Sequence, residues 1–183
     1  GGGRGKGGGG GGGGGGEGGG GEGGGGGGGG GDGGETPKIN DFENGISKQT
    51  FETAGVYNKD GQLILRKDGG TNHVKFNNDE IAQMKGSTLT HNHPSDATFS
   101  TDDIKMMAFA ELGEIRAVGV VYEYSMKNTA NISVYQYIQY RDDAITNVQK
   151  YPNVDDMTKG EFNHATWTEF ANLSGSEYTR STR

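Results

Sequence analysis

Apolar residues between positions 51 and 76 occur in short runs, and turn-forming residues close each run. The stretches FETAGVY (Phe51–Tyr57) and QLILRK (Gln62–Lys67) predict two strands. Between them, NKDG (Asn58–Gly61) ends in Asp-Gly, which is a strong short-range signal for a hairpin turn. HVKF (His73–Phe76) predicts a third short strand after the next turn. This part of the chain therefore predicts an early β-hairpin.

Helical periodicity appears on both sides of the next apolar run. Two apolar positions share one face of a helix predicted from Asn78 to Lys85, and Gly86 stops it. STLTH (Ser87–His91) predicts a buried strand. An amphipathic helix is predicted over Asp102–Leu112, because its apolar residues recur at the spacing of one helical face. A weaker helical pattern covers Asn40–Gln49.

The C-terminal half begins with the most continuous apolar run of the chain. IRAVGVVYEYSM (Ile115–Met126) predicts one long strand, and NISVYQY (Asn131–Tyr137) predicts a strand that pairs with it. Tyrosines between 122 and 137 recur at period two, which is typical of strands with one amphipathic face. Helices are predicted over Asp142–Lys150 and Val154–Leu173. Together these elements predict an α/β fold in which helices flank a mixed β-sheet.

Glycine composition divides the chain in two. All residues from 1 to 34 are glycine except Arg4, Lys6, Glu17, Glu22 and Asp32. Polyglycine has no side chain to bury and loses the most backbone entropy on ordering. We therefore expect residues 1–34 to be a disordered linker and residues 35–183 to be one domain. Such a linker suggests that the domain is tethered to a larger protein.

Net charge and cysteine content exclude several classes of function. The formal net charge is −7, which argues against direct nucleic-acid binding. The chain contains no cysteine, so it has neither a disulfide framework nor a thiol nucleophile. No apolar run approaches the roughly 18 residues of a membrane span. With no signal peptide visible, the sequence favours a cytoplasmic or a phage- or host-associated protein.

The segment LTHNHPSDATFSTDDI contains the candidate chemistry. His91 and His93 stand two residues apart on an extended segment, so their imidazoles project to the same side. Asp103 follows one turn into the next helix. Two imidazoles and one carboxylate provide three ligands for Zn²⁺ and leave a fourth position to water, which is the arrangement of catalytic zinc sites. The sequence therefore predicts a single zinc ion bound by His91, His93 and Asp103.

Each of these residues also has a purely structural interpretation. Ser100-x-x-Asp103 has the spacing of a capping box, which stabilises a helix N-terminus without any chemistry. Asp102 would replace Asp103 as the ligand if the helix register moved by one residue. A metal-dependent hydrolase also needs a general base, and Glu52 at the head of a predicted strand is the candidate. Taken alone, Glu52 would be a solvated strand residue.

The combined pattern resembles a known family. HNHP followed by FSTDDI is similar to the JAMM signature (H-x-H-P, a spacer, S-x-x-D) of the JAB/MPN metalloproteases, and HNHPS resembles their RadC-like bacterial and phage branch. ETAGV resembles the segment that carries the catalytic glutamate in that family. The resemblance implies a cytidine-deaminase-like JAB/MPN architecture, with Glu52 as the general acid/base. It also implies that Ser100 stabilises the oxyanion.

The resemblance implies zinc-dependent hydrolysis of a peptide or isopeptide bond in a protein or peptide substrate. Two alternatives remain open at this point. One is a non-catalytic MPN- or RadC-like binding module associated with DNA repair or phage machinery. The other is an effector domain carried at the end of a larger bacterial or phage protein.

Two other histidines have structural interpretations. His73 precedes a short predicted strand and is expected to be solvated or bonded to its neighbours. His164 lies near Trp167 and Phe170 at helical spacing, and these aromatic residues are expected to pack in the core.

Overall fold

The computed structural model describes residues 36–183, which belong to one compact unit. The predicted linker over residues 1–34 lies outside these described residues. In chain order the elements are α1 (Ile39–Ile46), β1 (Thr53–Tyr57), β2 (Leu63–Asp68), α2 (Asn78–Ala82), β3 (Thr88–Asn92), α3 (Thr101–Phe109), β4 (Glu114–Val118), β5 (Tyr122–Lys127), α4 (Val134–Val148), the 3-10 helix η1 (Val154–Asp156), α5 (Lys159–Ser174) and β6 (Glu177–Thr182).

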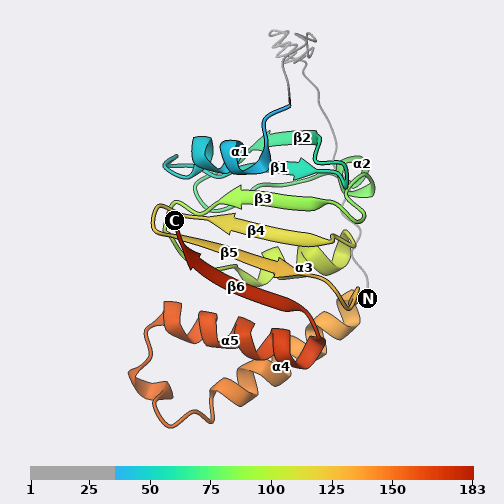
Figure 1. Ribbon diagram of the computed structural model, residues 1–183. Coiled ribbons are helices and arrows are strands. Elements are labelled where there is room, and N and C mark those ends of the chain that lie inside the picture. The colour runs from blue at the N-terminus through green and yellow to red at the C-terminus, as the bar shows by residue number, and fades with distance from the viewer. Residues whose placement is uncertain (1–35) are drawn as a thin grey trace, which may run out of the picture. The chain divides into compact units, whose positions relative to one another are not determined.

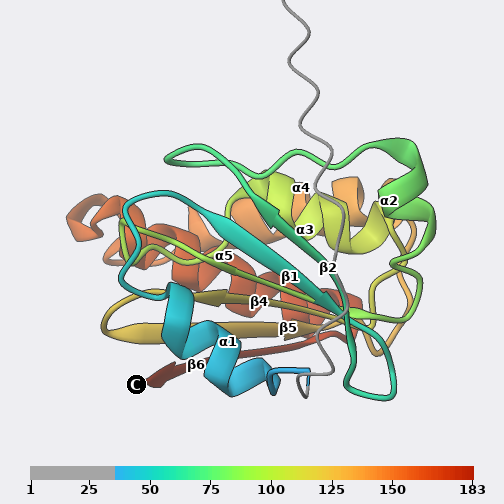
Figure 2. The same ribbon diagram turned by 90° about the horizontal axis from the view of Figure 1, so that it is seen from above.

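The strands form one six-stranded mixed sheet in the order β2-β1-β3-β4-β5-β6 (Figure 1). Only β3 and β4 are parallel, and all other neighbours pair antiparallel. Helix α1 covers one face of the sheet, whereas α3, α4 and α5 lie on the other (Figure 2). The predicted α/β fold with helices on a mixed sheet is confirmed.

The alternation of side chains in β1 supplies both faces of the sheet. Ala54 and Val56 belong to the large core beneath α3, α4 and α5, whereas Tyr57 packs in a smaller core with α1. Gly55 lies under α1, where an added Cβ would stand 2.7 Å from the Phe42 ring. Glycine at this position therefore lets α1 approach the sheet closely.

The connection from β3 through α3 to β4 places the candidate motif. Parallel neighbours in a sheet need a crossover, and here α3 provides it. The carboxyl end of β3 and the amino end of α3 are therefore close in space. Ligand sites in open α/β sheets commonly form at this end of the strands.

Most predicted elements before residue 113 are present. The hairpin β1–β2 turns at Gly61, whose φ of 78° is favoured by glycine. Helix α2 is shorter than expected and begins after Asn77, whose side chain accepts a hydrogen bond from the Glu80 amide. Helix α3 begins at Thr101 and ends before Glu111, which has a positive φ.

Two strand predictions, one before residue 113 and one after it, were wrong. His73–Phe76 is not a strand, because the backbone carbonyl of His73 accepts a hydrogen bond from the Gly70 amide instead of joining a ladder. Ile115–Met126 is not one strand but the hairpin β4–β5. Its turn is held by Asp96, whose Oδ1 accepts hydrogen bonds from the backbone amides of Val121 and Tyr122. That contact is remote in sequence, so the local pattern contained no signal for it.

The prediction of a strand over Asn131–Tyr137 was wrong. Ser133 caps a helix there, and α4 runs from Val134 to Val148 as one continuous element that includes all but the last two residues of the expected helix over Asp142–Lys150. The capping box between Ser133 and Gln136 was the signal that the tyrosine alternation obscured. Tyr137 instead packs against Phe170 of α5.

The last segment also differs from its prediction. Val154–Leu173 is divided into η1 and α5, because Thr158 forms a new capping box with Glu161. Gly175 ends α5 in a left-handed conformation. Strand β6, which no pattern predicted, then pairs with β5 along its length. None of the helices within residues 36–183 combines the length and apolar character needed to cross a membrane.

Candidate metal centre

The two motif histidines point their imidazoles at one another. His91 lies near the end of β3 and His93 follows that strand, and both side chains are buried. Their Nε2 atoms are 2.8 Å apart. The two-residue spacing on an extended segment therefore produces the convergence that the sequence predicted.

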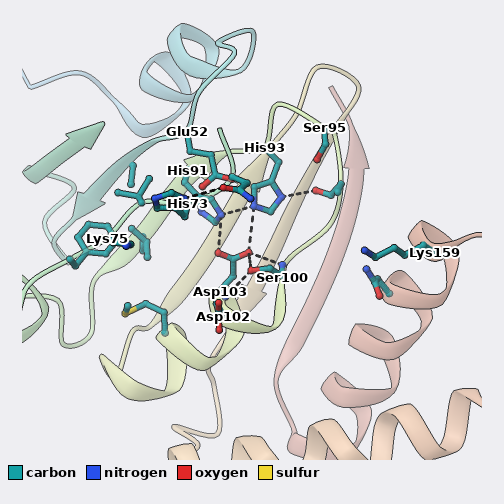
Figure 3. A pocket seen from close by; sticks show the side chains of 18 residues that line it. Glu52, His73, Lys75, His91, His93, Ser95, Ser100, Asp102, Asp103 and Lys159 are labelled. Carbon is teal, nitrogen blue, oxygen red and sulfur yellow. Dashed lines mark hydrogen bonds and ion pairs between the residues drawn. The ribbon is translucent and has the colours of Figure 1, made fainter. Parts of the chain in front are cut away.

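Asp103 completes the cluster from helix α3. Its Oδ1 is 3.2 Å from the Nε2 of His91, and its Oδ2 is 3.4 Å from the Nε2 of His93 (Figure 3). One ligand atom from each residue lies within 4.8 Å of the others, and the cluster could hold a metal ion. Asp102 is exposed and does not belong to this cluster, so the helix register selects Asp103.

Asp103 belongs both to the capping box of α3 and to the candidate metal cluster. The backbone amide and the hydroxyl of Ser100 each donate a hydrogen bond of 2.7 Å to Oδ2 of Asp103. The Asp103 amide in turn donates to the Ser100 hydroxyl at 3.2 Å. These bonds lock the carboxylate in one rotamer. The structural and chemical interpretations of Ser100-x-x-Asp103 are therefore compatible.

A hydrogen bond behind His93 sets its ring orientation. Nδ1 of His93 lies 2.8 Å from the carbonyl oxygen of Ala97, which can only accept. Nδ1 must therefore carry a proton, and neutral His93 presents its Nε2 lone pair to the cluster. Metal-binding histidines commonly have such an outer partner. Nδ1 of His91 is buried and finds no hydrogen-bond partner among residues 36–183.

Burial and charge act in opposite directions on this cluster. Burial disfavours the charged form of Asp103, but the two imidazoles outweigh it and hold its pKa well below the ordinary value. Burial likewise disfavours imidazolium at His93, but the hydrogen bond and charge of Asp103 raise its pKa above the ordinary value. A carboxylate is therefore present at neutral pH in a cluster that attracts positive charge.

Glu52 faces the same cluster. It immediately precedes β1 and is 7% exposed. In Figure 3 its side chain lies above the two imidazoles, whereas Asp103 lies below them. Burial is the main cause that raises its pKa, and the nearby histidines oppose this shift. The structure thus places Glu52 in the neighbourhood that the sequence predicted.

A cleft of about 580 Å³ contains Glu52, the three cluster residues and Ser100. One part of its wall is apolar, formed by residues that include Val74, Phe76 and Met106. The irregular segment before α2 supplies Val74 and Phe76, so no local pattern indicated that they lie near the site.

Sequence reasoning also missed the polar residues of the cleft. Lys75, Lys159 and Asn163 line it from distant parts of the chain, and Ser95, two residues after His93, lines it as well. His73 is exposed and has Asn72 as a local partner at 3.0 Å, as expected, but it also lines the cleft.

The remaining aromatic predictions concern the core. Trp167 and Phe170 are buried in the core, as the sequence predicted for these two aromatic residues. Trp167 also donates a hydrogen bond of 2.9 Å from Nε1 to the carbonyl of Phe99. It therefore supports the loop between His93 and Ser100.

The cluster geometry suits a tetrahedral ion. Ligands about 2.1 Å from such an ion lie about 3.4 Å from one another. Oδ1 of Asp103 lies 3.2 Å from the Nε2 of His91 and Oδ2 lies 3.4 Å from the Nε2 of His93, so each carboxylate oxygen has this spacing from one imidazole. The two imidazole nitrogens, at 2.8 Å, need to separate by only about half an ångström. The residues therefore fit a zinc ion.

No protein-family model, no curated protein and no solved structure matches this chain. What the chain does is therefore inferred from the cluster and its cleft.

Proposed function

We propose that this chain is a zinc-dependent hydrolase of peptide or isopeptide bonds, with a JAMM-type site in a JAB/MPN-like domain. His91, His93 and Asp103 hold the ion, and Glu52 is the general acid/base. The observation that carries the proposal is the convergence of two imidazole nitrogens and one carboxylate beside buried Glu52 in one cleft.

When bound, zinc supplies a Lewis acid and lowers the pKa of a coordinated water. Three protein ligands without cysteine match a catalytic site, whereas structural zinc sites usually close with four ligands. Such a set supports a catalytic ion over a structural one.

Glu52 moves the proton in this proposal. Its carboxylate accepts a proton from the water that attacks the amide carbon, and donates it to the nitrogen as the C–N bond breaks. Burial raises the pKa of Glu52, which brings its proton affinity closer to that of a base working near neutral pH. The position beside the cluster, rather than the pKa, is what assigns this role to Glu52 over other carboxylates.

Ser100 has two roles in the proposal. Its backbone amide and hydroxyl hold Asp103. The resemblance assigns the hydroxyl a further bond to the developing oxyanion. To donate that bond, the hydroxyl has to turn away from Asp103, while the backbone amide keeps the carboxylate in place.

The binding-module and effector alternatives are separated from the hydrolase by activity. A scaffold does not need a buried glutamate beside an intact set of three ligands, and both are present here. This combination favours an enzyme that acts on a protein or peptide substrate.

The test uses the full chain, with zinc measured by elemental analysis and hydrolysis followed on fluorogenic peptides and isopeptide-linked conjugates. We expect one zinc per chain and hydrolysis that a chelator abolishes. Glu52→Gln should retain zinc and lose activity by about 10²- to 10⁴-fold. Glu123→Gln, which removes a carboxylate on β5 that accepts a bond from Ser181, is the matched control. Full activity in Glu52→Gln would remove Glu52 from the mechanism, and zinc without any hydrolysis would favour the binding module.

A further inference from the structure

Asn92, the residue between the two histidines, has a side chain with an unusual set of partners. It is fully buried. Its Oδ1 accepts a hydrogen bond of 2.6 Å from the backbone amide of Thr53. Its Nδ2 donates one of 2.8 Å to the backbone carbonyl of Phe51. Asn92 therefore bonds to the residues on either side of Glu52.

These bonds continue the β1–β3 pairing beyond the point where the backbone ladder stops. The last backbone pair between the strands is Ala54 with His91. Beyond it the chain remains paired with β4 only, and the amide of His93 donates to the carbonyl of Val118. The backbone of β3 makes no ladder bonds to the segment around Glu52, and the side chain of Asn92 bonds to that segment in their place.

The opposite side of that segment is held by the end of β2. The Glu52 amide donates to the Gly70 carbonyl at 2.7 Å, and the Glu52 carbonyl accepts from the Gly69 amide at 2.8 Å. The Glu52 backbone is therefore fixed between β2 and the Asn92 amide, and its side chain is free to face the cluster.

We propose that Asn92 is a positioning residue that sets the distance between Glu52 and the metal ligands. This inference rests on the proposed function. His91, Asn92 and His93 are consecutive, so the ligand pair and the support of Glu52 move as one rigid unit.

The chemistry of the side chain explains why asparagine stands here. Only an amide of this length offers one acceptor and one donor side by side. An ionised aspartate would place an acceptor against the Phe51 carbonyl, and alanine would leave the buried Thr53 amide and the Phe51 carbonyl without these partners.

Substitution of Asn92 should separate metal binding from catalysis. In Asn92→Ala the backbone around Glu52 loses its support on one side, whereas the imidazoles and Asp103 keep their own contacts. A misplacement of about 1 Å can lower the rate about 100-fold. We expect kcat to fall by about 10- to 100-fold with Zn²⁺ affinity within about threefold of wild type. Because Glu52 is the group displaced, Asn92→Ala should have no further effect in the Glu52→Gln background.

Thr90→Val is the matched control, because Thr90 is a buried residue of the same strand with one side-chain bond, to Glu43. It should leave kcat within about threefold of wild type, since its partner lies away from Glu52. If Asn92→Ala fails to fold, Asn92→Asp keeps the size and the acceptor for Thr53 and should show the same loss. An Asn92 variant as active as Thr90→Val, or one that loses Zn²⁺ and activity in parallel, would overturn the inference.

A measurement without substrate tests the positioning separately from the hydrolase. Co²⁺ replaces zinc, and the pH dependence of its visible absorption reports the charge that faces the ion. Asn92→Ala should shift this profile in the same direction as Glu52→Gln, whereas Thr90→Val should leave it unchanged. If both variants shift the absorption profile but the wild-type protein hydrolyses no substrate, the proposed function is refuted and the positioning role of Asn92 is kept. Hydrolysis in wild type, together with an Asn92→Ala profile that does not shift, would support the proposed function and refute the positioning role of Asn92.

Discussion

Two buried polar clusters lie on opposite faces of strand β3, and they differ in how completely their charges are matched. On the α1 face, Glu43 accepts bonds from the Nε and Nη2 of Arg116 at 2.6 Å and 2.9 Å, and from Thr90 at 2.7 Å. This Glu43–Arg116 cluster (Glu43, Thr90 and Arg116) pairs one carboxylate with one guanidinium through two hydrogen bonds.

The His–His–Asp cluster (His91, His93 and Asp103) on the other face is not closed in this way. Its two imidazole nitrogens point at the same space, and a carboxylate faces both. The first cluster needs nothing further, so it acts in stability. In the His–His–Asp cluster several electron-pair donors converge, and a cation could bind them. This cluster is therefore the candidate functional site.

The largest expected effect is a loss of Zn²⁺ affinity when a residue of the His–His–Asp cluster is substituted. His91→Ala removes one of three ligands and should weaken Zn²⁺ binding by more than about 100-fold, since even outer partners of ligands are worth about 10- to 100-fold. Competition with a chromophoric chelator measures it. Asp102→Asn, a change at the neighbouring exposed carboxylate, should stay near wild type. Equal affinities in His91→Ala and wild type would mean that the ion binds elsewhere.

The Glu43–Arg116 cluster should respond in stability instead. Arg116→Met leaves Glu43, 2% exposed, as an unpaired buried carboxylate and should lower the free energy of unfolding by about 3 kcal/mol. Urea unfolding measures the loss, and Zn²⁺ affinity should stay within about threefold. Restoring most of the stability in the double variant Glu43→Leu/Arg116→Met would confirm that the loss comes from the unpaired charge. A loss of zinc binding in Arg116→Met would contradict the separation of the two faces.

A smaller effect is expected at the support of the ligand loop. The Tyr178 hydroxyl on β6 lies 2.8 Å from the Thr98 hydroxyl and 2.9 Å from Nδ1 of His164. Tyr178→Phe removes both contacts and should lower the free energy of unfolding by about 1–2 kcal/mol, with a modest loss of Zn²⁺ affinity. Tyr135→Phe, at an exposed tyrosine of α4, is the control for unfolding measurements. Unchanged stability in Tyr178→Phe would show that β6 does not hold the loop.

The smallest effect is a pH dependence of the metal-free protein, prepared with a chelator. The pKa of His93 is raised above 6.5 in the fold, so its stabilising contribution is complete below pH 6.5 and is lost as the pH rises through the folded pKa. The pKa of Asp103 is lowered below 3.8, so its contribution is complete above pH 3.8 and is lost as the pH falls. Stability from this cluster is therefore greatest between these values.

Urea unfolding from pH 3 to pH 9 checks this window. Asp103→Asn removes the carboxylate that both shifts depend on, so the difference in stability between wild type and this variant should be largest inside the window. A constant difference across the range would contradict the charge coupling within the cluster.

How much could be predicted from sequence also differs between parts of the chain. The cluster of His91, His93 and Asp103 was predictable because it depends on local geometry: the two-residue strand period, and a capping box that places Asp103 one turn into α3. The hairpin turn at Gly61 was predictable for the same reason.

The C-terminal third was harder, because its local signals competed. Tyrosine alternation suggested a strand where the Ser133 capping box begins α4. Nothing in the residues of β6 distinguishes them from a polar tail, because five of the six are exposed and the strand exists only by pairing with β5. Long-range pairing is a property of the partner strand as much as of the segment itself.

By itself, the sequence determined the residue types of the His–His–Asp cluster, their spacing and the helix that presents Asp103, because backbone periodicity and capping act within a few residues. Only the tertiary structure decided which residues surround them. Strand pairing brought Glu52 into the same cleft and gave the Asn92 side chain its bond to Phe51, and loop packing placed the Ala97 carbonyl against His93. These arrangements depend on the whole chain being folded.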